Sequence, residues 1–160
     1  MNLRTLAVFW LLSLSVALGT EIRFPIPGQD WEITIEGPVL NKFNIAEQEN
    51  GRIKGMANAG RFNVTLFVEP PPAGSVVGTH TACRDFYWTQ AKRNPHIVEE
   101  SILFSMKPNC QGVEYRTQGT FQGTPYVQDH VNCYFVHQGK WVDLHASIIT
   151  PQPEDTAQLK

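Results

Sequence analysis

The stretch VNCYFVHQGKWVDLHASII, residues 131–149, decides the fold of this chain. Apolar and polar side chains alternate along both of its halves, which is the pattern of two half-buried β-strands. The dipeptide Gln138-Gly139 separates the halves and predicts a two-residue turn. We therefore expect an antiparallel hairpin in which His137 lies opposite Lys140.

This register divides the side chains of the hairpin into two faces. One face is apolar and is expected to lie in the core; its members are Val131, Cys133, Phe135, Val142, Leu144, Ala146 and Ile148. The other face mixes polar and aromatic side chains; its members are Asn132, Tyr134, Val136, Trp141, Asp143, His145, Ser147 and Ile149. A shift of one residue would mix the two sets, so the pattern itself selects the register.

The rest of the chain reads as short strands around one helix. Strand-like segments bounded by turn residues occur at 31–35, 43–46, 52–56, 62–68, 97–106 and 112–118. Between the segments at 62–68 and 97–106, an amphipathic helix is expected at residues 79–93, and Asn94-Pro95 ends it. Pro151 and Pro153, followed by two acidic residues, predict the start of a short terminal helix.

These elements predict an α+β fold, in which helices pack on the faces of an antiparallel β-sheet. The apolar stripe of the central helix is expected to cover the apolar face of the hairpin; it consists of Ala82, Cys83, Phe86, Tyr87 and Ala91. The competing architecture is an all-β barrel of the lipocalin type, which the central helix disfavours.

The first nineteen residues predict where the protein works. Arg4 precedes a short apolar run that closes on Ala17-Leu18-Gly19, and these are the parts of a secretory signal peptide. The run is too short for a stable membrane span, and the alternative is an uncleaved N-terminal anchor. We therefore expect a signal peptide at residues 1–19 and a single domain at 20–160, secreted or periplasmic, in a bacterium and without a membrane span after cleavage.

Composition excludes some partners. The chain carries 13 basic and 15 acidic residues, and no basic run or stripe marks a surface for nucleic acid. Cys83, Cys110 and Cys133 match no zinc pattern and allow one internal disulfide, whose pairing the sequence leaves open. No cofactor is expected.

The polar face of the hairpin carries the densest chemical signal. Across it we expect Asn132 opposite His145, Tyr134 opposite Asp143, and Val136 opposite Trp141, each pair within contact distance. One interpretation is that these polar groups satisfy one another, or that a terminal helix covers them. The other is a shallow binding site for a protein, peptide, glycan or other small molecule, formed by Tyr134, Trp141, Asp143 and His145.

Trp88 is a second candidate for that surface. It falls on the polar side of the expected helix, four residues from Arg84 and from Lys92. It either packs against a neighbouring loop, such as the one around Pro70, or marks an exposed contact surface.

Asp143, His145 and Ser147 also suggest a hydrolase or a metal-dependent enzyme. Alternate residues on a strand stand about 6–7 Å apart, whereas a nucleophile and its base must be in hydrogen-bond contact. No G-x-S-x-G motif is present. A metal site would need His130 or His137 as a further ligand, and the register places His137 on the other face.

Two segments give the chain a resemblance to a known family. Residues 83–95, CRDFYWTQAKRNP, and residues 141–147, WVDLHAS, resemble small secreted bacterial members of the PsbP-like superfamily. That superfamily includes an extrinsic photosystem protein and the Mog-type Ran-binding proteins. The resemblance implies an α/β/α sandwich and a role in binding or assembly, and it supplies no catalytic residues.

The sequence thus predicts an exported, non-enzymatic binding or assembly domain whose partner is unknown. The alternative is a small hydrolase or metal-dependent enzyme that uses Asp143, His145 and Ser147. On the first interpretation, substitution of Trp141 or Asp143 should weaken ligand binding and leave the fold intact.

Overall fold

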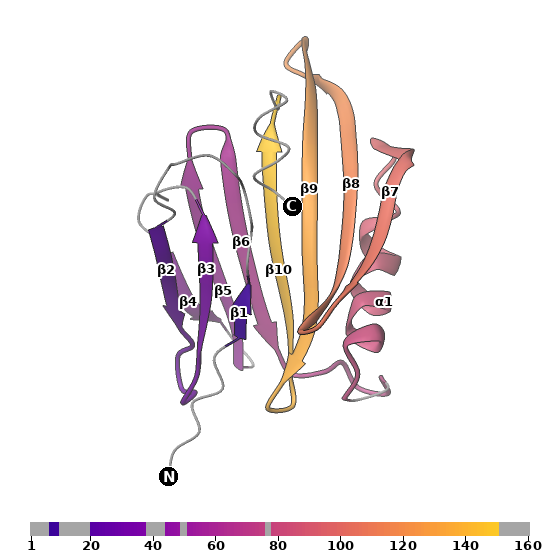
Figure 1. The fold of residues 1–160 in the computed structure, drawn as a ribbon. Helices are drawn as coiled ribbons and strands as arrows, with labels where there is room; N and C mark the ends of the chain where they lie inside the picture. The colour runs from indigo at the N-terminus through magenta and orange to yellow at the C-terminus, as the bar shows by residue number, and fades with distance from the viewer. Residues whose placement is uncertain (1–6, 10–19, 38–43, 49–50, 76–77, 151–160) are drawn as a thin grey trace.

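The computed structural model describes residues 7–9, 20–37, 44–48, 51–75 and 78–150. Within these residues it contains ten β-strands and one α-helix (Figure 1). The strands form two sheets, one of seven strands and one of three. In Figure 1 the small sheet lies in front of one half of the large sheet, and the helix lies behind the other half.

The large sheet is antiparallel throughout, with strand order β4-β5-β6-β10-β9-β8-β7. Its strands are β4 (Asn44–Gln48), β5 (Arg52–Ala59), β6 (Phe62–Glu69), β7 (Ile97–Lys107), β8 (Cys110–Phe121), β9 (Thr124–His137) and β10 (Lys140–Ile149). Consecutive strands are joined by hairpins except at β6, which pairs with the last strand, β10. The decisive hairpin therefore lies in the centre of the sheet.

The expected register of that hairpin is confirmed. His137 lies opposite Lys140, Tyr134 opposite Asp143, and Asn132 opposite His145. Gln138 and Gly139 both have positive φ angles, of 46° and 72°. Two consecutive residues with positive φ are the mark of the type I′ turn, whose twist matches that of the flanking strands.

The small sheet consists of β2 (Thr20–Pro25), β3 (Glu32–Gly37) and β1 (Ala7–Phe9). β2 and β3 are antiparallel, and β1 pairs with the other edge of β3 in parallel. β2 was not expected, because Pro25, Pro27 and Gly28 interrupt the local pattern. Nevertheless Phe24 and Ile26 are buried on one face, since alternate residues of a strand point to the same side.

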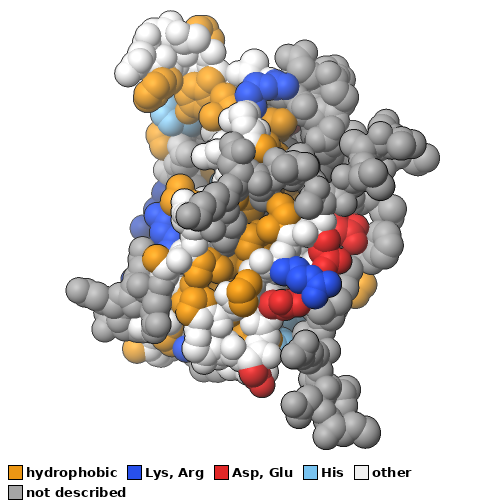
Figure 2. Space-filling model, turned by 90° about the vertical axis from the view of Figure 1, so that its left-hand side faces the viewer, with side chains coloured by type: hydrophobic (Ala, Val, Ile, Leu, Met, Phe, Trp, Pro, Cys, Tyr) orange, Lys and Arg blue, Asp and Glu red, His pale blue; other side chains and the backbone are white. Residues whose placement is uncertain are grey.

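The main core lies between the two sheets. The small sheet and its turn contribute Phe24, Ile26, Trp31, Ile33 and Ile35, and the large sheet contributes Ile53, Phe62, Val64, Leu66, Val68, Phe135, Val142, Leu144 and Ile148. Figure 2 views the side on which β2 lies in Figure 1 and shows hydrophobic side chains gathered along its middle, with charged side chains at the flanks. We call the large-sheet face that lines this core the inner face.

The single described helix, α1 (His80–Ala91), packs on the opposite, outer face. Thr79 caps it, because the Thr79 hydroxyl accepts a hydrogen bond from the Ala82 amide at 3.1 Å. Its buried side chains are Cys83 and Trp88, which pack with Val113, Tyr134 and Trp141 in a second core cluster. The predicted helix is thus confirmed, although it covers the other face of the hairpin.

The expected α+β class, with helices packed on the sheet faces as in an α/β/α sandwich, is wrong. The described residues form ten strands and a single helix, so the fold is β-sandwich-like. The physical reason lies in the inner face, whose apolar stripe the small sheet covers, while the stripe of α1 packs on the outer face. A helix and a second sheet can each cover the apolar face of the hairpin. The alternation of apolar and polar residues therefore does not decide which of the two covers it.

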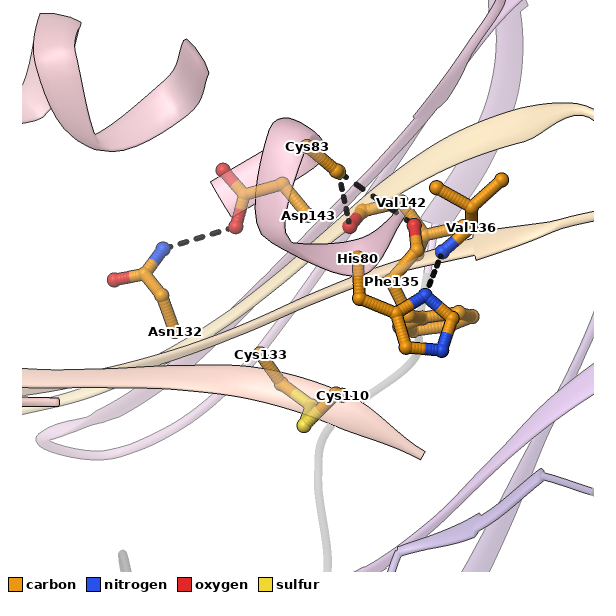
Figure 3. The surroundings of a disulfide bond; sticks show 9 residues. All are labelled: His80, Cys83, Cys110, Asn132, Cys133, Phe135, Val136, Val142 and Asp143. Atoms are coloured by element: carbon orange, nitrogen blue, oxygen red, sulfur yellow. Dashed lines mark hydrogen bonds between the residues drawn. A yellow bond between two sulfur atoms is a disulfide. The ribbon is translucent and has the colours of Figure 1, made fainter. Parts of the chain in front are cut away.

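A disulfide joins Cys110 of β8 to Cys133 of β9 on the inner side of the sheet. Cys83 remains a free thiol, buried beneath α1 within 3.6 Å of the Phe135 carbonyl oxygen (Figure 3). Burial raises the pKa of the Cys83 thiol to about 12. The sheet therefore separates the free thiol from the disulfide.

Some predictions fall outside the described residues. Most of the predicted signal peptide and the expected terminal helix after Thr150 are among them. α1 has 12 residues, and no helix in the described ranges combines the length and the apolar content needed to cross a bilayer.

Candidate functional site

Three of the predicted site residues are buried in the cluster that joins α1 to the sheet, namely Tyr134, Trp141 and Trp88. Tyr134 and Trp141 are each 1% exposed. Tyr87 stacks on Tyr134 with ring centroids 5.7 Å apart, and Phe86 meets Trp141 edge-on at 5.4 Å. Aromatic side chains at such distances form a packed layer, so neither Tyr134 nor Trp141 is available to a ligand at the surface.

Trp88 is also buried rather than exposed. Its indole packs between Phe104 of β7 and Tyr115 of β8, at centroid distances of 5.8 and 5.3 Å. Arg84 lies over the ring of Phe104 and accompanies this contact. Trp88 therefore fixes α1 to the edge of the sheet. Its partners in these contacts are strand residues, whereas the sequence suggested the loop around Pro70 or an exposed surface.

Asp143 lies beside this aromatic layer and is half-buried. Its carboxylate accepts a hydrogen bond of 2.9 Å from the side-chain amide of Asn132 (Figure 3). Burial raises the pKa of Asp143, the hydrogen bond from Asn132 lowers it, and the nearby Glu69 carboxylate raises it, so that the net pKa is about 7. Asp143 thus exchanges its proton near neutral pH.

His145 belongs to a chain of hydrogen bonds that crosses four strands. His145 Nδ1 lies 3.2 Å from the Thr65 hydroxyl of β6, and its Nε2 lies 2.9 Å from His130 Nδ1 of β9. His130 Nε2 lies in turn 2.9 Å from the Thr117 hydroxyl of β8. We call these four residues the histidine chain.

The two imidazole rings of the histidine chain are joined end to end. Their planes are within 11° of parallel and their centroids are 5.2 Å apart, which suits two rings linked through their edges by an N–H···N bond. Tyr115 stacks face to face on His130 at 4.6 Å. Burial lowers the pKa of His130 to about 3, assisted by the neighbouring His145, and burial lowers the pKa of His145 to about 4.

With one proton on each ring, the histidine chain has two equivalent arrangements. Either Thr117 donates at one end and the Thr65 oxygen accepts at the other, or every bond reverses its direction. In the first arrangement the Thr65 hydroxyl hydrogen is available to a further acceptor. In the second, the Thr65 oxygen is available to a further donor.

The catalytic constellation considered from the sequence is not assembled. His145 bonds to His130 and Thr65, Asp143 bonds to Asn132, and the Ser147 hydroxyl accepts a bond of 3.0 Å from Gln128. These bonds do not join Asp143, His145 and Ser147 to one another, so they do not form the triad that the sequence suggested. Across the described ranges, no three His, Cys, Asp or Glu side chains are grouped so that they could hold a metal ion.

The outer face carries a hollow of about 380 Å³ over β4, β5 and β6. Its lining residues are Asn44, Ala46, Lys54, Met56, Ala57, Asn58, Asn63, Val64 and Thr65. Thr65 therefore both lines the hollow and ends the histidine chain. We call this site the outer hollow.

The chemistry of the outer hollow is simple. Lys54 is the one charged residue among its lining residues, and its ammonium also lies 5.6 Å from the ring centre of Phe67. The three asparagine amides offer both donors and acceptors, and Thr65 offers either. Such a lining suits a polar ligand that is neutral or negatively charged, and it disfavours a cation.

Sequence reasoning missed the outer hollow although a signal was present. Lys54, Met56 and Asn58 alternate with buried positions along β5, and Asn63 and Thr65 do so along β6. Pairing of β5 with β6 places Met56 opposite Thr65 and Asn58 opposite Asn63. Each polar stripe is visible in the sequence, and the pairing of β5 with β6 joins the two into one wall of the hollow.

Comparison of the chain with family models, curated proteins and solved structures finds no match. The resemblance to the PsbP-like superfamily therefore stays a prediction, and the site is interpreted from its own geometry.

Proposed function

We propose that this protein is an exported, non-enzymatic binding domain that takes a small polar ligand carrying a carboxylate in the outer hollow. The observation that carries the proposal is the lining of the hollow, in which one ammonium, three amides and one hydroxyl surround a space of about 380 Å³. Ligand sites combine a concave surface with a few polar groups that fix orientation.

Lys54 supplies the preference for negative charge. An ammonium beside a bound carboxylate forms a charge-assisted hydrogen bond, which is stronger than a neutral one. The amides of Asn44, Asn58 and Asn63 can bind hydroxyl or carbonyl groups of the same ligand. Thr65 adapts to a donor or an acceptor, because the histidine chain can reverse its direction.

The test uses three forms of one sugar that differ mainly in charge. Glucuronate, glucose and glucosamine are titrated into the protein by isothermal calorimetry. We expect affinity to fall in that order, and Lys54→Gln to remove the advantage of glucuronate over glucose. Lys92→Gln, which removes the same charge from the exposed end of α1, is the matched control and should keep the order.

Two results would contradict the proposed site. One is the absence of binding by all three sugars, and the other is an order of affinity that Lys54→Gln and Lys92→Gln change equally.

Export is supported by the signal-like pattern of residues 1–19 and by the Cys110–Cys133 disulfide, since disulfides persist in oxidising compartments. Cleavage after Gly19 would keep β2, which begins at Thr20, and would remove β1 from the edge of β3. Mass spectrometry of the protein from its natural host should find Thr20 at the N-terminus; an intact Met1 would contradict cleavage.

A further inference from the structure

The far end of the histidine chain lies outside the outer hollow. Thr117 of β8 is 3% exposed and His130 of β9 is 9% exposed, and neither residue lines the hollow. Thr65 of β6 does line it, and β9 and β10 lie between β6 and β8 in the large sheet (Figure 1). The histidine chain therefore connects a buried hydroxyl group to the proposed site across two intervening strands.

The bond between the two rings couples the positions of their hydrogens. Because the pKa of His130 is lowered to about 3 and that of His145 to about 4, each ring is neutral at pH 7 and carries one N–H. Their bond joins His130 Nδ1 to His145 Nε2 at 2.9 Å, so one of these nitrogens carries the hydrogen and the other is bare. Both rings therefore carry their hydrogen on Nδ1, or both carry it on Nε2. We call these the Nδ1 pattern and the Nε2 pattern.

The two patterns present different groups to the outer hollow. In the Nδ1 pattern, His145 donates to the Thr65 oxygen, and the Thr65 hydroxyl hydrogen is available to an acceptor on a ligand. In the Nε2 pattern, Thr65 donates to His145, and its oxygen is available to a donor on a ligand. A carboxylate, which only accepts hydrogen bonds, therefore favours the Nδ1 pattern.

The Thr117 hydroxyl allows both patterns at the buried end. It lies 2.9 Å from His130 Nε2, to which it donates in the Nδ1 pattern and from which it accepts in the Nε2 pattern. Without this hydroxyl, the Nε2 pattern would leave a buried N–H unpaired, whereas the Nδ1 pattern would leave only a bare ring nitrogen. Unpaired buried N–H groups are rarer in proteins than acceptors that lack a donor, so loss of the hydroxyl should favour the Nδ1 pattern.

We propose that Thr117 and His130 are positioning residues of the outer hollow, which act through His145 to set whether Thr65 offers a ligand a hydrogen or a lone pair. Thr117 thereby influences the preference for a carboxylate without touching the ligand. The effect on ligand choice rests on the function proposed above, whereas the coupling of the two rings does not.

The first test needs no ligand. In protein that is isotope-labelled at histidine, nuclear magnetic resonance at pH 7 distinguishes a ring nitrogen that carries hydrogen from a bare one. The wild-type rings of His130 and His145 should show the same proportion of the Nδ1 form. Thr117→Val should place the hydrogen on Nδ1 of both rings, and Thr117→Ser, which keeps the hydroxyl, should retain the wild-type proportion. Unequal proportions in the wild type, or Thr117→Val protein that keeps its fold by circular dichroism and carries hydrogen on Nε2 of His145, would overturn the proposal.

The second test measures ligand choice by isothermal calorimetry. With the two patterns equally populated in the wild type, Thr117→Val should raise the affinity for glucuronate by about twofold, because all molecules then offer the Thr65 hydrogen. The affinity for glucosamine, whose ammonium donates, should fall. Adding Thr65→Val should remove both effects, and Thr117→Ser should show neither.

The outcomes separate the two proposals. An unchanged ratio of the two affinities in Thr117→Val, while glucuronate still binds, would overturn the effect on ligand choice. Absence of binding by every sugar would instead contradict the proposed function, and the ring patterns of the first test would still decide whether Thr117 sets the state of His145.

Discussion

At the scale of single residues, Asp143 changes the stability of the fold with pH in the direction opposite to His130 and His145. The folded-state pKa of Asp143 is raised from 3.8 to about 7. Between these values the folded chain holds a proton that the unfolded chain releases, so the stability that Asp143 contributes falls as pH rises. His130 and His145 have lowered pKa values, so below their ordinary 6.5 the unfolded chain takes up protons that the folded chain does not.

The two histidines outweigh the one carboxyl group between about pH 4 and 6.5. For these three groups, the free energy of unfolding should therefore be greatest near pH 6.5 and should decline more steeply toward acid than toward base. The decline toward acid reflects proton uptake by His130 and His145 in the unfolded chain, because the histidine chain of the folded protein stays neutral until the pH approaches its lowered pKa values.

Asp143→Asn removes the contribution of the carboxyl group to the pH dependence of the free energy of unfolding. Asparagine keeps the bond from Asn132 and carries no charge, so the variant should gain stability over the wild type as pH rises from 4 to 8, by on the order of 4 kcal/mol. Urea unfolding at several pH values measures this difference. Asp85→Asn on the exposed side of α1 is the control, and parallel pH curves for Asp143→Asn and wild type would contradict the account.

At the scale of elements, Trp88 is one of the side chains that fix α1 to the sheet. Trp88 fills the space between Phe104 and Tyr115, and its neighbour Thr89 is exposed. Truncation of a buried tryptophan removes a large buried area and leaves a cavity. Exposed positions of the same helix change stability little.

Trp88→Ala should therefore lower the free energy of unfolding by about 3–5 kcal/mol. Thr89→Ala should change it by less than about 0.5 kcal/mol. Urea denaturation followed by circular dichroism provides both values. A loss at Trp88 as small as that at Thr89 would mean that the indole is a surface contact after all.

Local elements were the most predictable part of the fold. The 131–149 hairpin and the helix could be predicted because their turn, cap and stop residues are adjacent in sequence: Gln138-Gly139, Thr79 and Asn94-Pro95. β2 could not, because Pro25 and Pro27 resemble a loop, and its burial depends on residues more than a hundred positions away. The layer that covers each face is likewise a property of distant contacts.

At the scale of the whole molecule, the two faces of the large sheet have different roles. The inner face is committed to the core with the small sheet, and the outer face is divided between the aromatic cluster beneath α1 and the outer hollow. The sequence predicted a polar and aromatic outer face on β9 and β10. It could not show that α1 buries the Tyr134 and Trp141 part of that face.

This division changes what substitution of Trp141 means. From the sequence, Trp141 was a ligand contact whose loss would spare the fold; in the structure it is a core residue whose loss should destabilise the fold. The binding surface that we propose instead lies on β4–β6, where Thr65 connects it to His145 by a hydrogen bond.

The most direct test of the account is a nuclear magnetic resonance titration of the isotope-labelled protein with glucuronate. Binding in the outer hollow should shift backbone amide signals of residues 54–58 and 63–65, with smaller changes at His145 through the Thr65 hydroxyl. Shifts confined to residues 132–136 and 141–144 beneath α1, or no shifts at all, would contradict it.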